Sequence, residues 1–380
     1  MREVSIVGAN MIRFGRYPDK TVTQIGQEAV LGLLKNMNVD REKIDAVYTG
    51  TVFGGSLISQ RIFKEFGMTG IPMYNVENAC ASGATAFHQA YLSIATGIYD
   101  VALVVGTELL SSLGGGTLPL NNEDIEVNHG IVMPGVYAMR ANRYMKENGV
   151  SAEDLAHVSV KNRYNGSLNP YAHFQEEVSF EKVLNSKMIA EPFNLLQCCP
   201  TSDGAAAVLI CAKDRKREFS DLSVKVKASI ITSGYFKGGY RDMTWPEITY
   251  RATYDAYKQA EVGPQNIDFA EVHDAFTIAE ILYYESMGFC EKGEGHKFVK
   301  EGKASLDGEV AVNPSGGLMS RGHPVGASGV AQVVEAFWQL TGQAGKRQVK
   351  DARVGLTHVT GGGISGVDNG ACGVHIFATE

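Results

Sequence analysis

Ala81-Ser82-Gly83 and Ala327-Ser328-Gly329 are two copies of one short segment, and a long helical pattern follows each copy. Other apolar stretches recur around these segments in the same order along the chain. The matched stretches are residues 5–9 with 229–233, 43–47 with 266–270, 100–106 with 351–357, and 205–211 with 372–378. Self-similarity in a fixed order is the signature of an internal duplication. The sequence therefore predicts two homologous halves.

Each half alternates apolar strand patterns with amphipathic helix patterns and closes on a further apolar strand. This order predicts a mostly parallel sheet covered by helices, so the fold class is α/β. Two such halves are expected to pack back to back around a shared layer of helices. In sheets of this kind, sites form at the carboxyl ends of the strands. The loops of both halves should therefore meet in one crevice.

A long segment without a counterpart interrupts the first half. We expect residues 1–112 plus 201–220 to form the N-terminal half, residues 113–200 an inserted loop or lid, and residues 221–380 the C-terminal half. Long insertions into compact domains are commonly lids or binding loops. A surface subdomain with no part in the site is the alternative.

Composition narrows the function classes. The chain has 380 residues, of which 44% are hydrophobic, and a formal net charge of −7. The acidic balance argues against a nucleic-acid surface but leaves room for a local basic patch that holds a phosphorylated cofactor. No stretch approaches the roughly 20 apolar residues that cross a bilayer, and residues 1–8 have the pattern of a strand and turn, not of a signal peptide. The six cysteines are scattered, which predicts no disulfide framework and a reducing cytoplasm.

The segment from Asn78 to Ala84 places a single thiol, Cys80, between a strand-like run (71–76) and a helix-like run (84–95). Backbone N–H groups at a helix N-terminus favour thiolate over thiol, and small neighbours leave the sulfur open to a carbonyl. The pattern thus predicts a nucleophile. A core or linker cysteine is the alternative, because most free cysteines are buried and inert.

Three histidines follow predicted strands or turns at the same edge. His323 lies among small residues in the turn that matches the Cys80 turn, which suits a general base for the thiol. His273 ends a strand and precedes Asp274, a position that suits a donor to an oxyanion; a helix cap is the alternative for this pair. His358 precedes three glycines and suits a proton carrier near neutral pH.

Gly361 and Gly362 follow His358 closely and would let backbone N–H groups point into the crevice as an oxyanion hole. His129, in the insertion, is equally compatible with a substrate contact and with a surface position, whereas His88 matches a helix face. The sequence contains no HxH, HExxH or cysteine–histidine cluster, so we expect no metal site. Its glycine clusters lack the GxGxxG spacing of a dinucleotide site.

Four motifs in this order make the chain resemble the thiolases over nearly its whole length. Cys80-Ala81-Ser82-Gly83 is similar to the CxS loop of that family, and Gly322-His323-Pro324 is similar to its GHP loop. His273-Asp274-Ala275-Phe276 resembles the His-Asp variant of SCP2-type and archaeal thiolases, where conventional thiolases carry Asn-Glu-Ala-Phe. His358-Val359-Thr360-Gly361-Gly362 resembles the HNxGG motif of the SCP2-like branch. The resemblance implies a thiolase-like fold, with duplicated βαβαβαββ halves in a five-layered αβαβα core and an inserted loop domain.

Two departures concern the second catalytic cysteine of conventional thiolases. Alignment of the glycines puts Val359 in its place, and Ala275 stands where an HDCF loop would supply a cysteine. Cys372 lies too far along the final strand to replace it. We therefore assign the second acid or base to His358.

The resemblance implies an acetyl-CoA C-acyltransferase that cleaves a 3-oxoacyl-CoA with coenzyme A, or runs the reverse Claisen condensation, through an acyl-Cys80 intermediate. His323 would deprotonate the thiol, His273 would polarise the carbonyl oxygen, and Asp274 and Phe276 would lie beside the substrate. Coenzyme A is then a co-substrate, and no covalently bound cofactor is expected. The expected substrate is acetoacetyl-CoA, or a bulky aromatic thioester such as benzoylsuccinyl-CoA, given the aromatic residues of the insertion.

The resemblance also implies a cytoplasmic homodimer, with a small zinc-ribbon and OB-fold subunit as a further partner in this branch and no nucleic-acid or membrane partner. Two alternatives stay open. One is a superfamily aldolase that cleaves a hydroxyacyl-CoA without using cysteine, and the other is a non-catalytic acyl-CoA-binding subunit. The retention of Cys80 together with His323 favours the thiolase over the aldolase.

Overall fold

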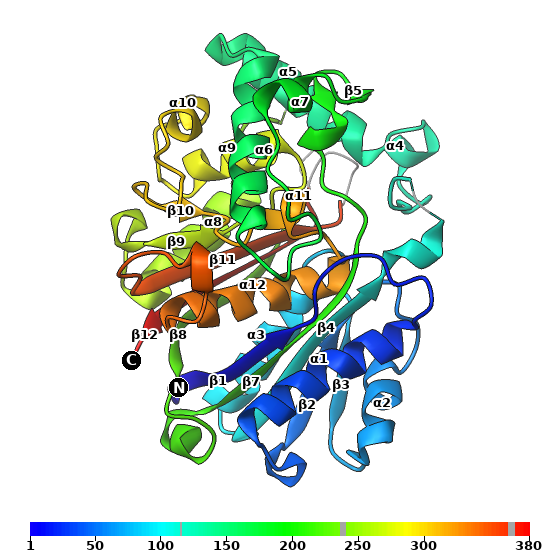
Figure 1. Ribbon diagram of the computed structural model, residues 1–380, viewed down its shortest axis with the longest axis vertical. Coiled ribbons are helices and arrows are strands. Elements are labelled where there is room, and N and C mark those ends of the chain that lie inside the picture. Colours follow the sequence, from blue (N-terminus) through cyan, green and yellow to red (C-terminus); the bar gives the residue numbers. More distant parts are fainter. Residues whose placement is uncertain (115, 236–240, 364–368) are drawn as a thin grey trace.

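The computed structural model describes residues 1–114, 116–235, 241–363 and 369–380. Residue 115 of the expected insertion and residues 236–240 and 364–368 of the expected C-terminal half lie outside this description. Within the described residues, ten strands form one sheet (Figure 1). In spatial order they are β10 (Ala311–Val312), β9 (Phe269–Glu271), β11 (Val354–Gly361), β12 (Ala371–Thr379), β8 (Val224–Ser233), β1 (Val4–Met11), β7 (Asp203–Ala212), β4 (Val101–Leu109), β2 (Ala46–Gly50) and β3 (Met73–Val76).

The two ends of this sheet repeat the same topology, which confirms the predicted duplication. In the N-terminal half β3, β2 and β4 are parallel and β7 is antiparallel to β4; β10, β9, β11 and β12 repeat this order in the C-terminal half. The halves are also joined edge to edge, a feature that the repeat did not predict. Strand β8 pairs with β1 through Ser5 with Lys225 and Ile6 with Val224, so the hydrogen-bonded ladder is continuous between the halves.

Two central helices, α3 (Ser82–Ala95) and α12 (Val325–Leu340), contact each other and the strands of both halves. All sixteen residues of α12 are buried, and its polar side chains Ser328, Gln332, Glu335 and Gln339 are hydrogen-bonded to other parts of the protein. The repeated glycines let the helices touch. A Cβ on Gly83 would lie 2.7 Å from the Gly326 carbonyl oxygen, and one on Gly329 would lie 2.4 Å from the Ala84 nitrogen. The repeated Ala-Ser-Gly segment therefore marks the point where the two halves meet.

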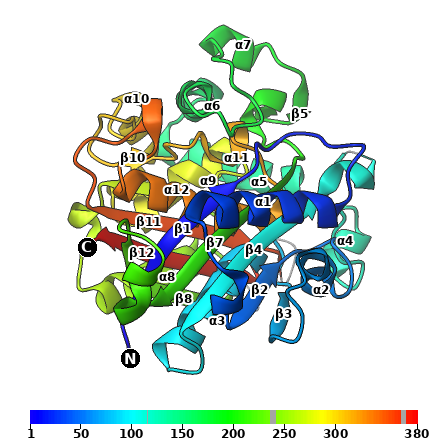
Figure 2. The same cartoon turned by 60° about the horizontal axis from the view of Figure 1, so that its bottom comes forward.

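Outer helices cover the other faces of the sheet. Helix α1 (Val22–Met37) and the short α2 (Ile58–Phe63) cover the N-terminal half (Figure 2), while α8 (Glu247–Ala260) packs on β8 and β12 with α9 (Thr277–Ser286) beside it. Strand β4 shows how one strand serves two layers. Val101, Leu103 and Val105 belong to the core under α1, whereas Ala102 and Val104 belong to the core around α3 and α12. The layers follow the expected αβαβα order.

The segment between β4 and β7 folds mainly into helices and rests on loops of the C-terminal half. Its elements are α4 (Ile125–Asn128), α5 (Met133–Asn148), α6 (Ala152–Ser167), α7 (Phe180–Leu184), β5 (Met188–Ala190) and β6 (Phe193–Asn194). Helix α6 contacts α9, α10 (Gly295–Lys300) and α11 (Gly317–Ser320) (Figure 1). The boundaries at residues 112, 200 and 220 stay predictions. Among the described residues, no helix is both long and apolar enough to cross a bilayer.

Candidate active site

Loops from both halves meet where the sequence predicted a crevice. Cys80 lies between β3 and α3, His273 follows β9, and His323 immediately precedes α12. The sulfur of Cys80 and one ring nitrogen of each histidine all lie within 4.8 Å of one another. The two imidazole rings are nearly perpendicular, with centroids 5.0 Å apart. The structure therefore brings together three of the four predicted catalytic side chains, although they are far apart in the chain.

A tight turn presents Cys80 at the start of α3. Ala79 has a positive φ of 49°, which a residue with a side chain rarely adopts and which costs roughly 1–3 kcal/mol. The Ser82 hydroxyl closes the turn, because it accepts a hydrogen bond from the Asn78 N–H (2.8 Å) and donates one to the Ala79 carbonyl (2.6 Å). Strain of this kind, held in place by a side chain from the following helix, is common at reactive centres.

The environment of Cys80 corrects the expectation that the helix terminus favours a thiolate. Burial raises the pKa of the Cys80 thiol to about 12, and the Glu108 and Glu77 carboxylates add to the rise; the Gly362 and Cys80 N–H groups act in the opposite direction. Desolvation thus outweighs the backbone donors of the helix start. At neutral pH the sulfur carries its proton, so a neighbouring base has to remove it during the reaction.

His323 is set up as that base by its hydrogen bonds. Its Nδ1 lies 2.8 Å from the Ser328 hydroxyl, and this hydroxyl donates its single proton to the Pro324 carbonyl (3.0 Å). With the hydroxyl proton assigned to Pro324, Ser328 accepts from Nδ1–H, and this tautomer leaves a lone pair on Nε2. Burial lowers the pKa of His323 well below its usual value, with smaller contributions from His273 and Arg321, so the ring is neutral at pH 7, and the same burial makes it a weaker base than a free imidazole.

His358 occupies a different place from the one its predicted role requires. It is fully buried in β11; its Nε2 bonds with the Thr249 hydroxyl (3.0 Å), and its Nδ1 accepts from the His273 N–H (3.5 Å). Its ring also meets Tyr283 edge-on, with centroids 4.5 Å apart. Both ring nitrogens are engaged by the protein. These contacts position His273. They do not favour the predicted proton transfer by His358, which stays a prediction.

The glycines after β11 approach the nucleophile loop closely. A Cβ on Gly361 would lie 2.7 Å from the Ala81 nitrogen and 2.9 Å from the Cys80 nitrogen, so only glycine fits there. Gly362 adopts a positive φ of 61°, and its N–H donates to the Cys80 sulfur. The predicted donors of an oxyanion hole therefore lie beside the Cys80 thiol. The Gly362 N–H points at the sulfur, and Gly361 allows the two loops to approach closely.

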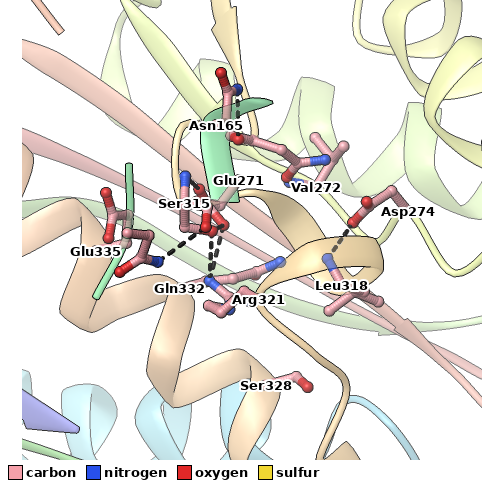
Figure 3. A network of polar contacts seen from close by, with 12 residues as sticks. Asn165, Glu271, Val272, Asp274, Ser315, Leu318, Arg321, Ser328, Gln332 and Glu335 are labelled. Carbon is pink, nitrogen blue, oxygen red and sulfur yellow. Dashed lines mark hydrogen bonds and ion pairs between the residues drawn. The ribbon is translucent and has the colours of Figure 1, made fainter. Parts of the chain in front are cut away.

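Asp274 is a structural clamp, which differs from its predicted place beside the substrate. Its side chain is fully buried, and its carboxylate accepts from the Leu318 N–H (2.7 Å), the Met319 N–H (3.3 Å) and the Asn162 amide (2.8 Å). Figure 3 shows the bond to Leu318 at the start of α11. The carboxyl group holds α11, which leads into the loop of His323, because it accepts from two N–H groups of that helix; burial raises the pKa of Asp274 well above its usual value.

Phe276 and His129, the two other predicted substrate contacts, differ in their surroundings. The Phe276 ring is buried and stacks on Tyr137, with centroids 4.5 Å apart. His129 caps the short helix α4 and is exposed. Phe276 thus belongs to an aromatic wall near the cluster, whereas no contact of His129 links it to the three catalytic side chains within the described part of the chain.

A buried ion pair supports the loop of His323. Arg321 is fully buried, and its Nη1 lies 2.9 Å from the Glu271 carboxylate, which also accepts from the N–H (2.9 Å) and hydroxyl (2.7 Å) of Ser315 (Figure 3). Glu271 ends β9, two residues before His273. One buried pair therefore ties together the chain segments that carry the imidazoles of His273 and His323.

Sequence reasoning missed Cys199 as a neighbour of the site and named Tyr137 only as one of the aromatic residues of the insertion. Cys199 donates its N–H to the Ala275 carbonyl (2.9 Å), and it keeps part of its surface accessible. Burial raises the pKa of the Cys199 thiol, and the charge of a Cys80 thiolate raises the pKa of both Cys199 and Tyr137 further. A second thiol thus lies close enough to Cys80 for the charges of the two groups to interact. No sequence motif marked Cys199, because an isolated β-bridge between Cys198 and Phe276 sets its position.

Two family models match most of the chain. The model of the thiolase N-terminal domain matches residues 4–214, and the model of the thiolase C-terminal domain-like family matches residues 238–368. The chain belongs to the thiolase family. Membership confirms the expected class, an acyltransferase of thiolase type with a thiolase fold, for a site built around one cysteine and two histidines.

Relatives of this thiolase are similar over their full length. The chain is 42% identical to an acetyl-CoA acetyltransferase of Methanothermobacter thermautotrophicus, with 100% of both chains covered, and 42% identical to the benzoylsuccinyl-CoA thiolase subunit BbsB of Thauera aromatica, with 95% of both covered. Among solved structures, the Ltp2-ChsH2(DUF35) aldolase aligns with a TM-score of 0.86 at 25% identity over 99% of this chain and 98% of that one. Human mitochondrial 3-ketoacyl-CoA thiolase, at 18% identity and a TM-score of 0.75 over 100% and 99%, shares the fold.

The pKa of Cys80 in this thiolase predicts a steep pH dependence of its reaction with iodoacetamide. Because the thiol titrates near 12, the thiolate fraction should rise about tenfold per pH unit between pH 7 and 9. Alkylation of the Cys80 peptide, followed by mass spectrometry, measures this slope. Free glutathione is the control, since its rate should level off as pH passes an ordinary thiol pKa of about 8.5. A Cys80 rate that is already flat at pH 7 to 8 would mean that a thiolate exists in the resting protein.

Proposed function

We propose that this chain is a thiolase that transfers an acyl group between Cys80 and coenzyme A. In one direction it cleaves a 3-oxoacyl-CoA, and in the other it performs the Claisen condensation of two acyl-CoA molecules. One observation carries the proposal: a thiol and two neutral imidazoles converge within 4.8 Å, and the Ser328 hydroxyl leaves His323 with its lone pair on Nε2. That is the arrangement of an activated nucleophile and its base.

The first half-reaction makes the acyl-enzyme. His323 Nε2 takes the proton of Cys80, and the thiolate attacks the 3-keto carbon. The Cα–Cβ bond then breaks, which leaves the acyl group on sulfur and the enolate of an acyl-CoA. His273 donates to the oxygen of the substrate, since burial lowers its pKa to about 3 and keeps its imidazole neutral. The N–H groups of Cys80 and Gly362 serve the other oxygen, because they already point at the sulfur.

The enolate needs one proton, and we assign this step to Cys199 in place of His358. Burial holds the pKa of the Cys199 thiol well above its usual value, so it enters the reaction protonated. His358 has both ring nitrogens bonded to the protein. In the second half-reaction coenzyme A returns a proton to Cys199 as its own sulfur attacks the acyl-enzyme, and His323 returns the other to Cys80. The two steps predict ping-pong kinetics.

Replacement of Cys199 with serine should slow both half-reactions. We expect turnover to fall by about 10²- to 10³-fold, because a hydroxyl is a much weaker acid, and acylation of Cys80 by acetyl-CoA should slow as well, since Cys199 protonates the departing coenzyme A in that direction. Steady-state rates and acyl-enzyme mass spectrometry provide the two readouts. Cys198→Ser, which alters the neighbouring thiol, is the matched control. Unchanged turnover in Cys199→Ser would return the second acid to His358, whose own variant, His358→Gln, would then show the loss.

Trapping the acyl-enzyme tests the function itself. The protein is incubated with acetyl-CoA, quenched in acid and digested, and the peptide that holds Cys80 is weighed. We expect the added mass of one acetyl group on Cys80, its absence in Cys80→Ala, and its removal by free coenzyme A. An unmodified peptide under turnover conditions would contradict the proposal.

The same experiment separates the thiolase from its two rivals. The likeness to the Ltp2-ChsH2(DUF35) aldolase favours an aldolase as the second candidate, and an aldolase that does not use cysteine forms no acyl-Cys80. A non-catalytic acyl-CoA-binding subunit would bind acetyl-CoA equally well before and after Cys80→Ala and would acylate in neither case.

The named relatives also support proposals for the substrate class and the partner subunits. The relatives named acetyl-CoA acetyltransferase and benzoylsuccinyl-CoA thiolase subunit support acetoacetyl-CoA, or a bulky aromatic 3-oxoacyl-CoA, as substrate. The wall of Tyr137, Phe276 and Phe193, whose rings contact in series, supports the aromatic choice. The subunit name of BbsB and the DUF35 component of the solved relative support a hetero-oligomer with a small zinc-ribbon and OB-fold subunit on a homodimeric core. We place this assembly in the cytoplasm.

A further inference from the structure

The three catalytic side chains also form a set of donors suited to a soft divalent cation. Cys80, His273 and His323 each offer one atom, and the three atoms lie within 4.8 Å of one another. Thiolate sulfur with two imidazole nitrogens is a donor set that zinc prefers, and three protein ligands leave a fourth position for water. The sequence predicted no metal site because the three residues belong to separate loops and form no motif. Only the fold assembles them.

The surroundings of the histidines match those of metal ligands. His323 donates Nδ1–H to the Ser328 hydroxyl, which fixes the ring and leaves Nε2 free, as the outer partner of a metal-bound histidine does. His273 is nine-tenths or more buried, and its Nδ1 has no hydrogen-bond partner among the described residues. His358 accepts a hydrogen bond from the backbone N–H of His273 and does not contact the nitrogens of its ring. Both imidazoles can therefore meet a cation without breaking a protein hydrogen bond at the coordinating nitrogen.

Distances and charge agree with this assignment. Ligand atoms around tetrahedral zinc lie roughly 3.3–3.8 Å apart, given Zn–S near 2.3 Å and Zn–N near 2.0 Å, so the cluster has to contract by about 1.5 Å at most. The Glu108 and Glu77 carboxylates act electrostatically on Cys80, whereas Arg321 acts on His323. Burial raises the pKa of Glu108 to about 7, so the negative charge that it contributes near the sulfur grows as the pH rises above neutrality, while the charge of Arg321 is offset by Glu271.

We propose that Cys80, His273 and His323 bind a zinc-class divalent cation, which reversibly blocks the nucleophile. On binding, the Cys80 thiol loses its proton to solvent, and an S–metal bond forms while the two neutral imidazoles add their nitrogens. No oxidation takes place, so a chelator removes the ion and the thiol recovers its proton. The metal occupies the sulfur that an acyl group would take, so the two exclude each other. The site stands on the geometry of the three side chains and does not depend on the proposed function.

Cobalt provides a direct spectroscopic test on the full-length, metal-free chain. Titration with Co²⁺ in thiol-free buffer should produce a sulfur-to-cobalt charge-transfer band in the near ultraviolet, saturating at one ion per chain, and Zn²⁺ should displace it. The band should disappear in Cys80→Ser. The affinity should fall by about tenfold or more in His273→Ala and in His323→Ala. Cys290→Ser, which changes a cysteine outside the cluster, is the control that should keep both band and affinity.

Protection from alkylation gives a second readout without substrate. With Zn²⁺ bound, labelling of the Cys80 peptide by iodoacetamide should slow by about tenfold or more, and a chelator should restore it. The proposal is overturned if no charge-transfer band forms, or if the band survives Cys80→Ser and disappears in Cys199→Ser or Cys198→Ser. Its failure is distinct from failure of the thiolase proposal, because acetylation of Cys80 by acetyl-CoA is measured separately and needs no metal.

Discussion

Replacement of Cys80 with serine is expected to lower the rate of 3-oxoacyl-CoA thiolysis by a factor on the order of 10⁴. The hydroxyl fits the turn, since the loop is built from Ala79, Ser82 and their backbone bonds and not from the sulfur. Its proton is far harder for the neutral His323 to remove than that of the thiol, and an alkoxide is a poorer leaving group in the second half-reaction. The loss should therefore appear in kcat, in both thiolysis and condensation.

Steady-state kinetics of both directions, with the thermal unfolding midpoint as a check on folding, measure this effect. Cys290→Ser is the matched control, because it makes the same chemical change at a cysteine remote from the cluster, and its rates should stay within about twofold of the parent. Retention of a tenth or more of the parent activity by Cys80→Ser would remove the covalent mechanism and leave the aldolase as the better assignment.

The second large effect concerns stability, at the buried pair of Arg321 and Glu271. Replacement of Arg321 with methionine should lower the free energy of unfolding by about 3–5 kcal/mol, because it leaves the Glu271 carboxylate buried without its counter-charge. Ser315 supplies only neutral donors to that carboxylate. Urea unfolding followed by circular dichroism gives the difference, and activity should fall with it, since the pair holds the segments of both catalytic imidazoles.

Two further variants isolate the cause. Arg321→Met combined with Glu271→Gln should recover part of the loss, because it removes the buried charge as well as its partner. Lys20→Met breaks an ion pair with Glu28 on the surface and should cost no more than about 1 kcal/mol. If Arg321→Met costs no more than Lys20→Met, the buried pair does not support the loop of His323.

Much of the fold could be predicted from the sequence because both halves carry the same pattern of apolar stretches. Matched apolar stretches predicted alternating strands and helices that close on a final strand in each half, and the resemblance to thiolases implied the full order βαβαβαββ. The structure adds that α3 and α12 meet at the repeated Ala-Ser-Gly segment, where only small residues allow the approach. The edge-to-edge joint of β1 with β8 could not be predicted, because two residue pairs leave no pattern of their own.

The candidate site divides in the same way. Strand ends and small residues marked Cys80, His273 and His323, and the structure brings them together. The same signal marked Asp274 and His358, which prove to hold α11 and His273 in place. A residue at a strand end can face the crevice or the layer behind it, and the local sequence does not distinguish these orientations.

The amino-acid sequence by itself determined which side chains stand at the carboxyl edge of a doubled α/β sheet, because strand and helix periods and repeated segments are local properties. Only the tertiary structure decided their chemistry. It desolvated the Cys80 thiol enough to keep its proton, oriented the ring of His323 through Ser328, and brought Cys199 close enough to Cys80 for their charges to interact. Desolvation and hydrogen-bond partners come from segments far apart in the chain, so these properties exist only once the chain has folded.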